Sequence, residues 1–205
     1  DLTITGTTPA TVAELIAINA ATSGAVSLNA QTIAAAYTDT AANLISAFTG
    51  TTTHTGGLTV SDVTAVSAAD LNMINNFKAS GTTTAIATSN ITGSALEIAT
   101  AIGSGTDFRP NVTLSITGAD PATIAELKTI NGDTIGAVVL NAVTNSAAYN
   151  DTAANLAAAF LGITTSTGDL TIAGTTAANL AELMTINAAT SGNVVLNPET
   201  NAAAL

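Results

Sequence analysis

One short signature recurs seven times along this chain: Thr, Ser or Asn, two small or apolar residues, then Glu, Asp or Asn, then Leu or Ile. Its copies, spaced 27 or 29 residues apart, begin at Thr11, Thr40, Ser67, Ser94, Thr123, Thr152 and Asn179. In each copy the first side chain can cap a helix by accepting a backbone N–H, and the fourth can reach back to the cap residue. A chain that starts a helix about every 28 residues is predicted to be a repeat protein.

The segment from one helix start to the next is called a coil here. Residues match best at a spacing of 56, so two unlike coils form one module. Leu2, Leu58, Leu114 and Leu170 are in register and belong to the first half-module, here named the A coil. The second half-module, the B coil, repeats at 112 residues, with Tyr37 matching Tyr149 and Phe48 matching Phe160. We therefore expect one continuous array over residues 1–205, with modules at 1–57, 58–113, 114–169 and an incomplete one at 170–205.

Short alternating runs indicate strands that bury one face only. They lie at 2–5, 26–29, 58–61, 84–87, 114–117, 138–141, 170–173 and 194–197, and a helix start follows each except the last. Strand, crossover helix and strand in one direction form a parallel, right-handed unit. The pattern predicts an α/β fold: a right-handed β/α solenoid with one parallel sheet and one short helix per coil of about 28 residues. The alternative is a parallel β-helix in which the short helices are turns.

Composition excludes several classes of function. The net charge is −11 with only three basic residues, Lys78, Arg109 and Lys128, which argues against nucleic acid and against anionic membrane surfaces. No apolar run is long enough for a membrane span, so we expect no membrane insertion. No signal peptide is visible, and the strand pattern begins at once, which suggests a piece or processed form of a longer protein.

The residues that usually carry chemistry give little sign of a catalytic or metal site. The chain has no Cys and one His, His54, which we interpret as a polar residue of a loop. The aligned Glu14, Asp70, Glu126 and Glu182 occupy the third helical position, where a carboxylate stabilises the cap and the helix dipole. We therefore predict no enzyme activity, no catalytic residues, no metal site and no cofactor. Whether Asp residues in turns take weak calcium stays open.

The outward strand positions are rich in Thr, Ser and Asn, and such a flat, uncharged surface can bind sugars or ice. Thr also suits exposed strands through its β-propensity alone. The candidate ligand-facing residues are Thr3, Thr5, Ser27, Asn29, Thr59, Ser61, Ser115, Thr117, Asn141 and Thr171. Five apolar residues and one further Asn are also assigned to this face: Ala85, Ala87, Val139, Ala173, Val195 and Asn197.

Three segments resemble a known kind of repeat: Leu-Thr-Val-Ser-Asp from Leu58, Ser-Ala-Ala-Asp-Leu-Asn from Ser67, and Asn-Ile-Thr-Gly-Ser-Ala-Leu-Glu-Ile from Asn90. They are similar to the tandem repeats of giant, repeat-rich bacterial cell-surface proteins, particularly those of cyanobacteria. The resemblance spans the whole chain and implies a structural or adhesive role outside the cell. It brings no catalytic residues.

The functional expectation is an extracellular or cell-surface structural module that serves as stalk, surface-layer or filament material. The alternative is an adhesin module that binds glycans or a surface through its Thr/Ser/Asn face. Expected partners are further repeats of the same chain or end-to-end copies of it, and surface glycans in the adhesin case.

Overall fold

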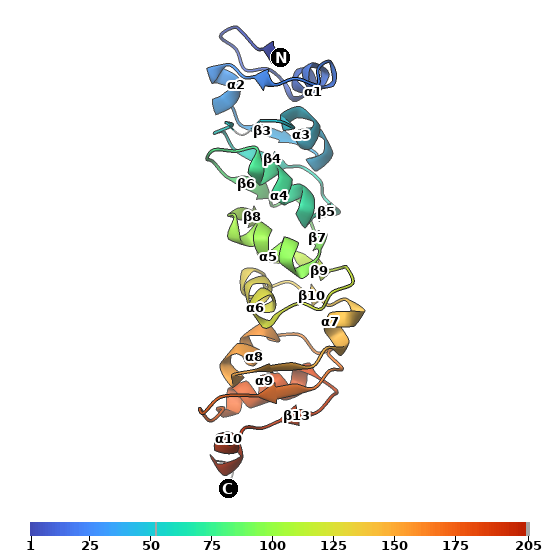
Figure 1. The fold of residues 1–205 in the computed structure, drawn as a ribbon, viewed down its shortest axis with the longest axis vertical. Helices are drawn as coiled ribbons and strands as arrows, with labels where there is room; N and C mark the ends of the chain where they lie inside the picture. Colours follow the sequence, from blue (N-terminus) through green and yellow to red (C-terminus); the bar gives the residue numbers. More distant parts are fainter. Residues whose placement is uncertain (52, 204–205) are drawn as a thin grey trace. The chain divides into compact units, whose positions relative to one another are not determined.

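The computed structural model describes residues 1–51 and 53–203, which form two compact units. Unit 1 comprises Asp1–Ile91 with Thr100–Arg109, and unit 2 comprises Thr92–Ala99 with Pro110–Leu205. Helices and strands alternate in both units, so the predicted α/β class is confirmed (Figure 1).

The helices of unit 1 are α1 (Val12–Ala20), α2 (Ala30–Ala34), α3 (Ala41–Phe48) and α4 (Ala68–Asn76). Its strands are β1 (Leu2–Thr3), β2 (Val26–Ser27), β3 (Tyr37–Asp39), β4 (Leu58–Val60), β5 (Ala65–Ser67), β6 (Thr83–Ala85) and β8 (Thr106–Phe108). The chain passes between the units in β7 (Asn90–Gly93) and α5 (Ala95–Gly103).

The helices of unit 2 are α6 (Ile124–Asp133), α7 (Ala142–Ser146), α8 (Ala153–Ala159), α9 (Leu180–Ala189) and α10 (Pro198–Ala203). Its strands are β9 (Thr113–Ile116), β10 (Val138–Val139), β11 (Tyr149–Asp151), β12 (Leu170–Ile172) and β13 (Val194–Val195).

All seven signature residues cap the start of a helix, as predicted. Four of them form a full capping box with the Glu three residues later: Thr11, Ser94, Thr123 and Asn179. The side chains of the other three, Thr40, Ser67 and Thr152, accept the backbone N–H of the third helical residue. Each cap stabilises its helix by about 1 kcal/mol, so the signature fixes where the helices begin.

Strand pairing is parallel throughout each unit. Unit 1 holds the pair β1–β2 and, separately, a sheet in the order β3–β4–β6–β8. Unit 2 pairs β9 with β10 and orders β11–β12–β13 in another sheet. Helices pack beside one another in the same sequence, α1 on α3 and α3 on α4, then α6 on α8 and α8 on α9 (Figure 1).

The expectation of one continuous sheet is wrong within unit 1, and the B coil gives the reason. It carries two strands rather than one: β2 pairs with the preceding A strand, and β3 pairs with the following one. The short helix α2 separates them, and α7 does the same between β10 and β11. The prediction of a single helix per coil is therefore wrong for these B coils.

Two further expectations are wrong at the level of single residues. The run near Thr84 is shifted by one position, because β6 buries Thr83 and Ala85 and turns Thr84 outward. A slip of one residue moves every side chain to the other face of a strand. The last run is followed by a helix after all, since α10 begins at Pro198 and Asn197 Oδ1 accepts the N–H of Thr200. Asn197, expected on the outward face, is buried.

The core is built from small and aliphatic side chains, with two aromatic clusters. Three A strands bury both of their inward residues: Leu58 and Val60 in β4, Leu114 and Ile116 in β9, and Leu170 and Ile172 in β12. In the B coils, Tyr37 packs edge-on against Phe48 at 5.3 Å, and Tyr149 against Phe160 at 5.4 Å. Edge-to-face pairs of this kind add about 0.5–1.5 kcal/mol beyond burial.

Candidate interaction surfaces

In α1 and α6, the Asn that follows the Ile near the helix end links that helix to the next one. In unit 1 the side-chain amide of Asn19 donates to the carbonyl of Ala47 at 2.8 Å, at the end of α3. In unit 2 the amide of Asn131 donates to the carbonyl of Leu161 at 2.7 Å and to that of Ala159 at 3.1 Å. The last carbonyls of a helix lack partners within the helix, so each Asn caps a neighbour about 28 residues away in sequence.

A second set of hydrogen bonds joins each A coil to the following B coil. The N–H of Ala10 donates to Thr32 Oγ1 at 2.9 Å, and Ala10 accepts the Tyr37 hydroxyl at 2.8 Å. Ala122 makes the same two bonds in unit 2, to Thr144 and Tyr149, both at 2.9 Å. Burial raises the pKa of Tyr149 to about 12, so its hydroxyl remains a donor over the whole physiological range.

Two of the predicted ligand-facing residues take part in such links. The amide of Asn29 donates to the carbonyls of Gly6 and Thr8, while its carbonyl oxygen caps α2. Asn141 does the same against Gly118 and Asp120, and it caps α7. Their side-chain polar groups therefore bind this chain itself, and the signal for this was the Asn-x-x-Thr spacing at the start of each short helix.

The remaining predicted surface residues fall into separate places. Thr3 and Ser27 are paired neighbours on β1 and β2, and Ser115 lies on β9 beside Val139 of β10. Thr5, Ser61 and Thr117 lie just beyond the A strands and are exposed. Thr171 lies on β12 between Asn150 and Val195. No single face gathers them.

Thr59, by contrast, lies in a regular row. In the β3–β4–β6–β8 sheet, Thr38, Thr59, Thr84 and Asp107 are successive register partners, and their strand neighbours on either side point inward. Parallel strands lie about 4.8 Å apart, so three hydroxyls and a carboxylate form one outward ladder. Thr38, Thr84 and Asp107 were not among the predicted ligand-facing residues. The Thr-Thr-Thr-Ala run fits either register, and no strand was predicted where Thr38 and Asp107 lie.

His54 lies in the connection between α3 and β4, and its side chain is buried there. Its side chain has 0% exposure and lies 4.8 Å from the Phe48 ring and 5.6 Å from that of Tyr37. Neither ring nitrogen has a hydrogen-bond partner of ordinary geometry. Burial is the main cause that lowers the pKa of His54, the Thr32 backbone opposes it, and the charge of Lys78 adds a further, smaller lowering. In unit 2 the buried Ser166 takes this place and donates to the carbonyl of Asn145.

The carboxylates lie at caps and turns. The pKa of Glu14 is lowered first by the backbone N–H of Thr11 and then by its hydroxyl. The pKa of Asp151 is lowered chiefly by the side-chain amide of Asn155. Two of the turn carboxylates considered for calcium are engaged: Asp62 accepts from the N–H of Ala41, and Asp169 accepts from Asn193. Across residues 1–51 and 53–203, His, Asp and Glu side chains nowhere gather in a group of three that could hold a metal ion.

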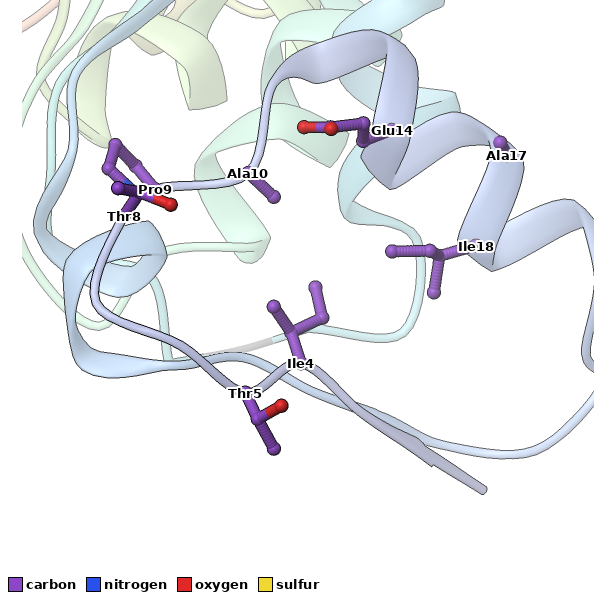
Figure 2. A pocket seen from close by; sticks show the side chains of 8 residues that line it. All are labelled: Ile4, Thr5, Thr8, Pro9, Ala10, Glu14, Ala17 and Ile18. Atoms are coloured by element: carbon purple, nitrogen blue, oxygen red, sulfur yellow. The ribbon is translucent and has the colours of Figure 1, made fainter.

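Figure 2 shows an open depression beside α1. The side chains of Ile4 and Ile18 point into it, and Glu14 borders it from the first turn of the helix. Its lining is Ile4, Thr5, Thr8, Pro9, Ala10, Glu14, Ala17 and Ile18. Apolar walls and a backbone edge suit a protein segment better than a charged small molecule.

Comparison of the chain with protein-family models, with curated proteins and with solved structures finds no match. Within the described part of the chain, every helix is too short or too polar to cross a membrane.

Proposed function

We propose that this chain is an extracellular structural repeat module, a right-handed β/α solenoid that serves as stalk, surface-layer or filament material and has no catalytic site. The recurrent links between coils carry the proposal. The hydrogen bonds of Asn19 recur at Asn131, and those of Ala10 recur at Ala122. In both cases the equivalent residue lies 112 positions later in the sequence. In these coils the polar side chains form hydrogen bonds to the neighbouring coil, which supports a structural role for the array.

The solenoid is tested by whether stability is local. Leu127 is fully buried, so Leu127→Ala should cost about 2–5 kcal/mol. In a solenoid each coil contacts only its neighbours, so amide exchange should accelerate around α6 and α8 and stay unchanged near Leu15. Leu183→Ala is the matched control, because Leu183 has the same repeat position but is only half-buried. Equal acceleration in all coils would indicate one cooperative core instead.

The location and role are tested on the source cells. Antibody raised against the chain should label intact cells, with a cytoplasmic marker as the control for leakage. The repeat resemblance at Leu58, Ser67 and Asn90 supports this expectation. Labelling that appears only after the cells are permeabilised would overturn the extracellular assignment.

The Thr ladder favours a second candidate function, a glycan- or surface-binding adhesin module. Thr38, Thr59 and Thr84 offer hydroxyls at the strand spacing, and Asp107 adds a charged acceptor at one end. A glycan array and an ice-recrystallisation assay test it. Thr59→Lys should abolish any selective binding, whereas Thr117→Lys, at an exposed position in unit 2, should not. Absence of binding by the unaltered chain would leave the purely structural role.

A further inference from the structure

The short segment around His54 is tied by backbone hydrogen bonds to two other parts of unit 1. The N–H of His54 donates to the carbonyl of Phe77 at 3.3 Å, and the N–H of Ala79 donates to the carbonyl of His54 at 2.8 Å. The next residue, Thr55, donates its N–H to the carbonyl of Ile33 at 2.8 Å. The segment therefore joins the end of α4 to α2.

Unit 2 repeats these backbone bonds with a different side chain in the middle. The N–H of Ser166 donates to the carbonyl of Ala189 at 3.1 Å, and the N–H of Ser191 donates to the carbonyl of Ser166 at 2.9 Å. The N–H of Thr167 donates to the carbonyl of Asn145 at 2.7 Å, and the hydroxyl of Ser166 donates to the same carbonyl. Unit 2 is therefore a control within the same chain, because it has the same joint without an imidazole.

The imidazole of His54 occupies a place that suits only its neutral form. The side chain is fully buried against the rings of Phe48 and Tyr37, and neither of its nitrogens has a hydrogen-bond partner. Its neighbour across an isolated parallel bridge is Lys78, where unit 2 has Thr190 beside Ser166. The positive charge of Lys78 opposes a second positive charge on His54.

The elements packed around His54 direct their carboxylates elsewhere. Asp39 of β3 accepts the N–H of Thr40 and the amide of Asn43 at the start of α3, and Asp70 lies in the first turn of α4. The titratable groups that face the imidazole are Lys78 and Tyr37, and neither is negative near neutrality. Attraction between an imidazolium and the two aromatic rings offsets only part of the cost of removing that cation from water.

We propose that protonation of His54 opens unit 1 locally, so that residues 53–56 leave their place between α2 and the end of α4 while the equivalent joint of unit 2 stays closed. The imidazolium then reaches water, and the Tyr37–Phe48 cluster loses its cover. This pH-sensitive joint goes beyond the proposed structural role and holds wherever the array is located.

The test compares amide exchange at Ala79 and Ser191 in the full chain, followed by NMR at about pH 7.5 and about pH 5. The two amides donate to equivalent carbonyls, and neither is next to a histidine in the sequence, so the direct effect of pH on exchange cancels in their ratio. The ratio of the Ala79 rate to the Ser191 rate should rise about three- to thirtyfold at the lower pH. The upper limit follows from an unfolded His pKa near 6.5.

Two variants that copy unit 2 separate His54 from other causes. His54→Ser should remove the pH-dependent change in the ratio. Lys78→Thr should reduce it, because the imidazolium then lacks a positive neighbour. A rise below about twofold, or a rise that persists in His54→Ser, would overturn the proposal. So would titration of the His54 ring resonance near pH 6.5 while Ala79 stays protected, because the protonated ring would then fit the closed joint.

Discussion

Asn131 on α6 and Leu161, just beyond α8, are joined by a 2.7 Å hydrogen bond from a side-chain amide to a backbone carbonyl across thirty residues of sequence. The same amide reaches the carbonyl of Ala159, so one side chain satisfies the end of a neighbouring helix. Because α3 and α8 each end with help from an Asn of the preceding coil, secondary and tertiary structure depend on each other at these helices.

Asn131→Ala should therefore destabilise unit 2 by about 0.5–1.5 kcal/mol, the net contribution of a hydrogen bond at a partly exposed helix end. Asn187 is the matched control, since it has the same repeat position on α9 but is exposed. Urea unfolding of both variants measures the difference. Equal losses for Asn131→Ala and Asn187→Ala would show that the amide link between helices contributes little.

The sequence allowed the helix starts and the buried A strands to be predicted, because both depend on local chemistry. Cap side chains at Thr11 and Thr123 and alternation after Leu58 act within a few residues. The second strand of the B coil could not be predicted, because β3 is only three residues long and is stabilised by pairing with β4. The Thr ladder was missed for a related reason: which of Thr83 and Thr84 points outward is decided by the sheet, not by the Thr-rich run itself.

His54 should make stability depend on pH near neutrality. Its pKa in the folded chain lies below the ordinary value of 6.5, so the unfolded chain binds the extra proton first as pH falls. Stability is then fully present above about pH 6.5 and decreases as pH falls toward the lower folded value. Carboxylates such as Glu14 and Asp151, whose pKa values are lowered, contribute losses only in more acidic solution.

The variant His54→Ser copies the residue that unit 2 has at this place, Ser166. Urea unfolding at about pH 7.5 and pH 5 should show a smaller pH dependence in this variant than in the unaltered chain. His54→Ser also removes ring contacts with Tyr37 and Phe48, so only the difference between the two pH values is diagnostic. An unchanged difference would mean that His54 is hydrated or protonated in the folded chain.

Tyr149 should resist ionisation in the folded chain. Its pKa is raised to about 12, and that of Tyr37 is also raised, in both cases mainly by burial. Each buried tyrosine has a higher pKa in the folded chain than in the unfolded chain, where the pKa is near 10. Its contribution to stability is therefore complete below about pH 10 and is lost as pH rises through the pKa of the folded chain. Absorbance at 295 nm during alkaline titration should therefore show less tyrosinate near pH 10 than two free tyrosines would give. Ordinary titration at that pH, with the fold intact by circular dichroism, would contradict the buried hydrogen bond to Ala122.

Two glycines should respond in opposite ways to the same substitution. A Cβ at Gly168 would overlap the carbonyl oxygen of Ala147, so Gly168→Ala forces the backbone of the B coil apart and should cost more than about 2 kcal/mol. Gly132 lies in the last turn of α6, with nothing within 4 Å of a Cβ built on it. Gly132→Ala should therefore stabilise the chain by about 0.5–1 kcal/mol through helix propensity. Urea unfolding of the two variants measures both changes in the free energy of unfolding. A stabilising Gly168→Ala would show that Gly168 and the carbonyl of Ala147 do not approach each other as closely as the structure requires.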